Sequence, residues 1–134
     1  MLAGKYNIVC QQGSTFDLFM TLQYPNPDFP ANCADPNACP EYVAWDLTGY
    51  TARMQVRKYV ESAVPVIELT TTNAGGYNRI TLGGTAGTIQ LFLRAEDTRQ
   101  ITQSGFYDLE IISPSNEVDR ILEGTFTLSP EVTR

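Results

Sequence analysis

Apolar and polar residues alternate along most of the chain, which is the pattern of β-strands with one buried face. Over residues 16–24, apolar side chains occupy every second position, and Asp17, Thr21 and Gln23 lie between them. The pattern predicts one long half-buried strand there. The same alternation predicts further strands around Cys10 and over residues 50–57, 64–69, 80–82, 89–93, 107–111 and 118–128.

One short segment has a different character. The sequence RAEDTRQI, residues 94–101, predicts a connecting helix of about two turns. About eight strands, spaced roughly ten residues apart, predict a single antiparallel β-sandwich domain over residues 1–134. The cysteine–tryptophan–cysteine spacing of antibody domains is absent, so the expectation is an immunoglobulin-like sandwich. Within the last strand, Gly124 predicts either a bulge or a close approach of another backbone.

A long interruption separates the strand at 16–24 from the strand at 50–57. Residues 25–40 are rich in proline, asparagine and aspartate and follow neither period, so they predict a long loop, which extends to about residue 46. Loops of this length in compact domains are usually functional. Phe29, Tyr42 and Trp45 lie in or beside the loop, and we predict that they contact a partner protein. Stacking on sugar rings, or pinning the loop to its own domain, are the alternatives.

The three cysteines do not form a complete set of disulfides. Cys10 falls on the inward face of the first strand, which predicts a buried free thiol. Cys33 and Cys39 share the loop, where they form either a disulfide or, in a reducing compartment, two thiols. Two cysteines without further cysteine or histidine partners fall short of a zinc site. We therefore expect no metal.

Composition excludes several classes of function. The 134 residues include no histidine, which removes serine–histidine and cysteine–histidine catalysis. The net charge of −6 argues against nucleic-acid binding. Asp108 and Glu110 share the outward face of one strand. We expect this face either to be solvated or to meet the basic face that carries Arg53 and Arg57, and not to act as a catalytic pair. We expect no enzyme activity, no cofactor, no signal peptide and no membrane span.

Three segments, taken in order, resemble a known class. They are DLTGYTARMQVR, which begins at Asp46, then ITLGGTAGTIQLFLRAEDT, and finally FYDLEIISPSNEVDRILEGTFTLSPEVTR. Together they resemble small structural proteins of tailed bacteriophages and prophages. More loosely, they are similar to the N-terminal domain family of phage baseplate upper proteins, an immunoglobulin-like sandwich. The loop with its cysteines departs from that pattern and looks like an insertion.

The resemblance implies a virion protein of the tail, baseplate or fibre-attachment region that acts by repeated contacts with other virion proteins. It implies synthesis in the host cytoplasm and no catalytic residues. A capsid decoration protein is the alternative within the same class, and a module that binds host-surface glycans is the alternative outside it. The terminal arms, residues 1–5 and 129–134, are the segments that we expect to exchange with neighbours.

Overall fold

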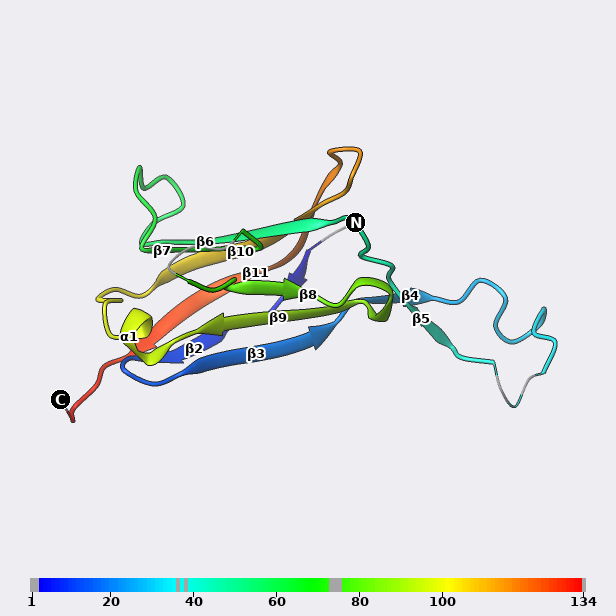
Figure 1. Cartoon of the computed structure of the whole chain (residues 1–134), viewed down its shortest axis with the longest axis horizontal. Coiled ribbons are helices and arrows are strands. Elements are labelled where there is room, and N and C mark those ends of the chain that lie inside the picture. The colour runs from blue at the N-terminus through cyan, green and yellow to red at the C-terminus, as the bar shows by residue number, and fades with distance from the viewer. Residues whose placement is uncertain (1–2, 36, 38, 73–75, 134) are drawn as a thin grey trace.

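The computed structural model describes residues 3–133 apart from residues 36, 38 and 73–75. Two β-sheets pack face to face, and a two-stranded hairpin extends from one end of them (Figure 1). The larger sheet contains β1 (Gly4–Lys5), β2 (Ile8–Gln11), β6 (Thr51–Arg57), β7 (Ile67–Thr70), β10 (Gly105–Ile112) and β11 (Val118–Ser129). The smaller sheet contains β3 (Phe16–Thr21), β8 (Ile80–Leu82) and β9 (Thr88–Leu93), and the hairpin consists of β4 (Gln23–Pro25) and β5 (Tyr42–Ala44). The helical turns are η1 (Gly84–Ala86) and α1 (Ala95–Thr98).

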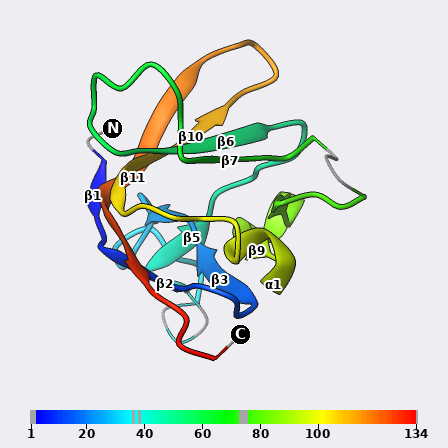
Figure 2. The same ribbon diagram turned by 90° about the vertical axis from the view of Figure 1, so that its left-hand side faces the viewer.

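The strand order is that of an immunoglobulin-like sandwich. In the larger sheet, β11, β10, β6 and β7 lie side by side in that order, and in the smaller sheet β9 lies between β3 and β8. Variable-type immunoglobulin domains arrange strands G, F, C and C′ in one sheet and strands B, E and D in the other, with the same order along the chain. Seen along the strands, the two layers separate clearly (Figure 2). The predicted all-β sandwich is confirmed.

The core lies between the two sheets and follows the predicted alternation. On β6, Met54 and Val56 are buried, and on β9 Leu91 and Leu93 face them from the other sheet. Each such side chain contributes about 1.5–3 kcal/mol on burial. The remaining buried residues come from both layers and their connections, and include Ile8, Cys10, Leu47, Ala52, Leu69, Ile80, Ile89, Ile101, Tyr107, Leu109, Ile111, Ile121 and Phe126.

The first two strands run parallel to β11, so the larger sheet is mixed and not wholly antiparallel as predicted. The chain passes Gly124 between β1 and β2. A Cβ atom at Gly124 would lie 2.2 Å from the carbonyl oxygen of Tyr6, so a side chain there would displace the incoming strand. The predicted close approach at Gly124 is confirmed. The bulge lies instead near Ile121, where the pairing of β10 with β11 shifts by one residue.

The single strand predicted over residues 16–24 is wrong, because the chain changes partners at Leu22. The amide N–H of Leu22 donates to the carbonyl oxygen of Gly87 at 2.8 Å, and the carbonyl oxygen of Leu22 accepts from the amide of Trp45 at 2.9 Å. The chain therefore leaves the smaller sheet and pairs with β5 from residue 23 onward. Tyr24, expected on the inner face, is 41% exposed.

Two other elements differ from their predicted ranges. The strand predicted over 64–69 begins only at Ile67. Before it, the amide N–H of Ser62 donates to the carbonyl oxygen of Tyr59 and closes a turn, and Val64 after this turn is exposed to solvent. The connecting helix exists but has one turn, Ala95–Thr98, rather than two.

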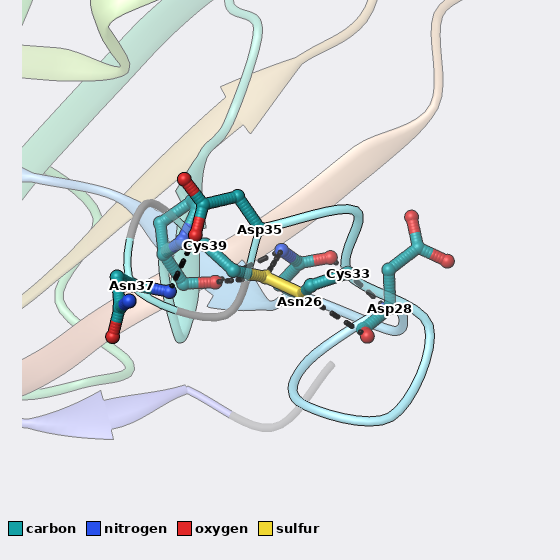
Figure 3. Close-up of a disulfide and its surroundings, with 7 residues drawn as sticks. Asn26, Asp28, Cys33, Asp35, Asn37 and Cys39 are labelled. Carbon is teal, nitrogen blue, oxygen red and sulfur yellow. Dashed lines mark hydrogen bonds between the residues drawn. A yellow bond between two sulfur atoms is a disulfide. The ribbon is translucent and has the colours of Figure 1, made fainter.

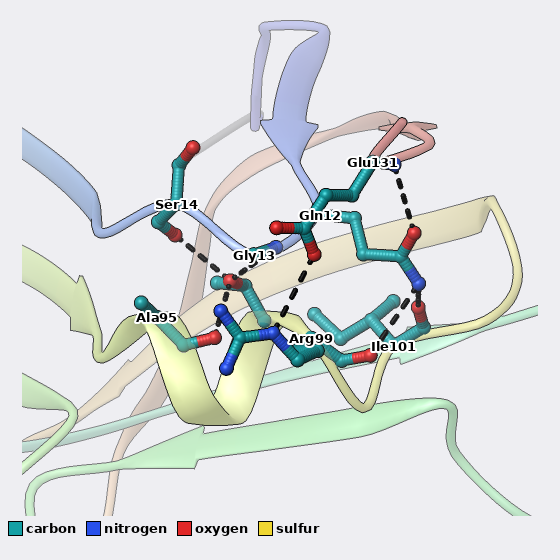
Figure 4. A network of polar contacts seen from close by, with 8 residues as sticks. Gln12, Gly13, Ser14, Ala95, Arg99, Ile101 and Glu131 are labelled. Carbon is teal, nitrogen blue, oxygen red and sulfur yellow. Dashed lines mark hydrogen bonds and ion pairs between the residues drawn. The ribbon is translucent and has the colours of Figure 1, made fainter. Parts of the chain in front are cut away.

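A buried threonine, Thr98, joins α1 to the β2–β3 turn at one end of the sandwich. Figure 4 shows Gly13 and Ser14 of this turn beside Ala95 and Arg99. Thr98 is fully buried, and its hydroxyl donates to the carbonyl oxygen of Ser14 at 2.8 Å. The side chain of Gln12 donates to the carbonyl oxygen of Ile101 at 2.8 Å and accepts from the amide of Glu131 at 3.0 Å. The segment after β11 is thereby tied to the same end.

In the part of the chain that the structure describes, both terminal arms pair with their own chain, and their exchange with neighbours stays a prediction. Gly4–Lys5 form β1 and pair with β11 of the same chain. At the other end, Ser129 pairs with Gln11, and the backbone of Glu131 bonds to Gln12. Residues 1–2 and 134 lie outside the described residues. Within the described chain, no helix has the length and hydropathy of a membrane-spanning segment.

Candidate contact hairpin

The hairpin of β4 and β5 projects past the end of the sandwich (Figure 1). Tyr24 lies opposite Val43 in its register. Beyond the strands, the amide of Asn26 donates to the carbonyl oxygen of Glu41 at 2.9 Å and prolongs the pairing. The predicted loop over residues 25–46 thus contains a strand and has an ordered base. We call residues 23–44 the contact hairpin.

A disulfide joins Cys33 and Cys39 in the loop of the contact hairpin, with 5.9 Å between the two Cα atoms (Figure 3). The side-chain amide of Asn26 donates to the carbonyl oxygen of Pro40 at 2.9 Å and accepts from the amide of Asp28 at 3.0 Å. These bonds all lie within the hairpin. A cross-link of this kind reduces the number of conformations that the loop can sample.

The three aromatic residues predicted to contact a partner lie in different surroundings. Trp45 is half-buried at the base of the hairpin, where its indole N–H donates to the hydroxyl of Tyr50 at 3.4 Å and its ring meets that of Tyr24 edge-on, with 6.0 Å between centroids. Tyr42 and Phe29 are 52% and 37% exposed. Trp45 therefore anchors the hairpin, and Phe29 and Tyr42 are the two that a partner can reach.

Tyr24 is an exposed aromatic residue for which the alternation over residues 16–24 predicts the wrong face. It lies on β4 beside Trp45, and its alternation is continuous with that of β3, which conceals the change of partner at Leu22. The signal that could have identified it is Pro25, because proline lacks an amide N–H and occurs on edge strands rather than inside a sheet.

The outer face of the larger sheet carries paired charges. Arg53 Nε lies 2.8 Å from a carboxylate oxygen of Glu110, and Arg120 Nε lies 3.4 Å from one of Asp108. Burial, followed by the nearby carboxylate of Glu110, raises the pKa of Asp108. The expected meeting of acidic and basic residues is confirmed for Arg53, whereas Arg57 bonds to neighbouring polar groups instead.

An open groove of about 640 Å³ runs over this face. Lys5 bonds to Glu123 at one end of the groove, and that hydrogen bond lowers the pKa of the Glu123 carboxyl. Phe106 and Val60, both exposed, lie at the other side. Acids and bases alternate across the groove, so the face is arranged for solvation rather than for a pair of carboxylates on either side of a substrate.

Among the described residues, the metal-binding residue types are not gathered into a site. Within the described residues, no three cysteine, aspartate or glutamate side chains lie close enough to hold a metal ion. Cys10 is fully buried on β2, which confirms the predicted core thiol, and burial raises its pKa. Reactive cysteines have a lowered pKa, so Cys10 is a packing residue.

Comparison with known proteins gives no relative from which to transfer a function. No family model matches the chain, and no curated protein matches it significantly.

Proposed function

We propose that this chain is a non-enzymatic structural protein of a tailed bacteriophage, located in the tail, baseplate or fibre-attachment region of the virion. The observation that supports the proposal most is the contact hairpin, which leaves the sandwich and presents Phe29 and Tyr42 to solvent. Aromatic side chains of this kind are enriched in the cores of protein interfaces. The resemblance of the segments from Asp46 onward to phage structural proteins supplies the class.

The contact hairpin acts as a fixed projection that docks on a neighbouring virion protein. The disulfide between Cys33 and Cys39 and the paired strands restrict the conformations of the projection before it binds, so less conformational entropy is lost on docking. A single contact of this kind is weak. Repetition around a symmetric particle makes many of them act together, and the assembly becomes stable without any single strong interface.

Two alternatives differ in where or what the hairpin binds. A capsid decoration protein would use the same projection on the capsid shell. A glycan-binding module would stack aromatic faces on sugar rings. The edge-on contact of Trp45 with Tyr24 and its bond to Tyr50 weigh against the glycan alternative, because they leave less of the largest aromatic ring for a sugar to stack on.

The first test is whether the chain is present in purified particles. Mass spectrometry of particles from a culture that carries the gene should detect it, at a copy number that is a small multiple of the tail symmetry. A copy number that scales with the capsid subunits would favour the decoration protein. If cells make the protein but purified particles do not contain it, the proposed role in the virion is wrong.

The second test concerns the exposed aromatic residues. The double substitution Phe29→Ser with Tyr42→Ser should lower incorporation into particles at least tenfold and leave the unfolding temperature within about 2 °C, because both side chains lie outside the core. The matched control is Tyr59→Ser, which removes an equally exposed tyrosine from the β6–β7 turn. Normal incorporation of the double variant would show that the hairpin is not part of the interface. Binding of the wild-type chain to sugars on a glycan array would instead favour the glycan-binding module.

A further inference from the structure

Most edges of the two sheets are protected against pairing with another chain. Arg79 covers β7 by donating its guanidinium N–H to the carbonyl oxygen of Glu68 at 2.9 Å. The edge strand β8 has only three residues, and the edge formed by β1 and β2 is divided into pieces of two and four residues. Covered, short and interrupted edges are the features by which natural sheets avoid association.

The edge of β3 has none of these features. β3 is six residues long, pairs with β9 without a break, and has no strand on its other side in the part of the chain that the structure describes. It contains no lysine and no proline, and Asp17 is its single charged residue. Phe19, in its centre, is 63% exposed.

The free backbone groups on this edge follow from the hydrogen-bond pattern. The amide of Leu22 donates to the carbonyl oxygen of Gly87, which continues the β3–β9 ladder by one residue. Bonded residues alternate in an antiparallel pair, so the even-numbered residues of β3 bond to β9. The N–H and C=O groups of Asp17, Phe19 and Thr21 therefore point away from β9, toward the open side.

An apolar groove of about 330 Å³ lies along the same edge, between β3 and the N-terminal strands of the other sheet. Leu18 and Met20 face inward from β3 but remain only half-buried. Some immunoglobulin domains place strand A beside strand B here, whereas the first strands of this chain pair with β11. The inner face of β3 is thus incompletely covered. Other lining residues are Tyr6, Leu22, Ile89, Ile121 and Leu122.

We propose that β3 pairs antiparallel with β3 of a second copy of this chain, about a twofold axis at Phe19. In this register Leu18 lies opposite Met20 of the second copy, and both side chains remain on the inner face, where they extend the core across the interface. Asp17 lies opposite Thr21, so the one charge of the strand meets no like charge. The result is a continuous six-stranded sheet made from two smaller sheets of three strands each.

The charge of the strand is what favours a second copy as the occupant. Twofold symmetry requires a surface that is complementary to itself, and a strand with one charge placed off the axis meets that requirement. Each copy carries a net charge of −6, so two copies repel each other at long range. Salt screens that repulsion, and association should therefore strengthen as ionic strength rises. The pairing uses a different surface from the contact hairpin and does not depend on a role in the virion.

Sedimentation velocity tests the pairing directly. The purified chain should form a dimer whose dissociation constant falls when sodium chloride is raised from about 50 to about 500 mM. Phe19→Lys places a charge on the axis of the interface and should weaken the dimer at least tenfold. The matched control Phe106→Lys replaces an exposed phenylalanine on the outer face of the larger sheet and should leave dimerisation unchanged.

A chemical cross-link tests the register of the proposed pairing. The variant Phe19→Cys should give a covalent dimer with a short bis-maleimide, because directly opposed residues in a sheet lie about 5 Å apart. Val118→Cys, on the opposite side of the fold, should not. A monomer at all concentrations, a dimer lost in Phe106→Lys but kept in Phe19→Lys, or cross-linking at residue 118 instead of 19 would each overturn the proposal.

Discussion

The sandwich body and the contact hairpin achieve order by different means. The body buries a continuous core between two sheets, and some of its strands are joined by long-range pairings such as β2 with β11. The hairpin pairs two strands of three residues and closes its loop with a disulfide. An isolated two-stranded hairpin is marginally stable at best, so the covalent bond and the half-buried Trp45 supply what a core supplies elsewhere.

This comparison suggests a division of roles, in which the body provides the stability of the fold and the hairpin provides a surface for contact. Buried residues in the body cannot change without loss of folding free energy, whereas exposed residues in the hairpin can change with little loss. Phe126 is fully buried and Tyr42 is 52% exposed, although both are aromatic residues on strands. If this separation is correct, substitutions in the body change unfolding and substitutions in the hairpin change assembly.

The largest effect is expected from Phe126→Ala. Phe126 lies in the centre of the core, against Phe16 with 6.5 Å between ring centroids, and its removal leaves a cavity. The free energy of unfolding should fall by about 3–5 kcal/mol, as measured by urea denaturation. Tyr42→Ala, the hairpin counterpart, should change it by less than about 0.5 kcal/mol. Equal losses for the two variants would mean that the hairpin is part of the folding unit.

A smaller loss is expected from Gly124→Ala. The new methyl group would meet the backbone of Tyr6, which cannot move without breaking the pairing of β1 or β2 with β11. Thermal unfolding should show a loss of about 1–3 kcal/mol. Gly4→Ala is the control, because its methyl group would meet mainly the flexible side chain of Leu122 at 3.3 Å. An unchanged free energy of unfolding in Gly124→Ala would show that the segment between β1 and β2 can shift to make room for the methyl group.

The body should also respond to alkaline pH through Tyr107. Burial, followed by the charge of Tyr6, raises the pKa of Tyr107 to about 12, and its hydroxyl donates to the carbonyl oxygen of Tyr6 at 2.6 Å. The folded state therefore retains a proton that the unfolded chain releases near pH 10. Stability should fall between pH 10 and 12, by at most about 1.4 kcal/mol per pH unit from this residue. Tyr107→Phe should have a shallower alkaline slope in denaturation series, although it is less stable at pH 7.

A small effect on global unfolding is expected from opening the disulfide. Cys33→Ser with Cys39→Ser should lower the global free energy of unfolding by less than about 1 kcal/mol, because the loop becomes free without exposing the core. Locally, hydrogen exchange at the amide of Asn26, which bonds to Glu41, should accelerate. A large fall in the unfolding temperature would show that the hairpin supports the body.

The body was largely predictable from sequence because each strand has its own alternation. The buried residues of β6, β9 and β10 were placed on the correct face, since a period of two assigns every second residue once one face is known. The parallel pairing of β1 and β2 was missed. Short terminal strands carry too few residues to indicate direction, and the partner strand β11 lies more than a hundred residues away.

The hairpin was less predictable, because its structure depends on pairings that alternation does not encode. The pattern over 16–24 continues across Leu22, and the change of partner there is decided by bonds to Gly87 and Trp45 from distant parts of the chain. Two of the three predicted contact residues, Phe29 and Tyr42, are exposed, whereas Trp45 serves the hairpin base. Their contact with a partner stays a prediction.

The central claim is that the contact hairpin can be removed from the sandwich without loss of the fold but not without loss of assembly. A single variant tests both halves: residues 26–40 are replaced by a two-residue Asn-Gly turn, and the unfolding temperature and incorporation into particles are measured on the same preparation. The account predicts an unfolding temperature within a few degrees of the wild type and incorporation reduced at least tenfold. A folded variant that enters particles at the wild-type level would contradict it.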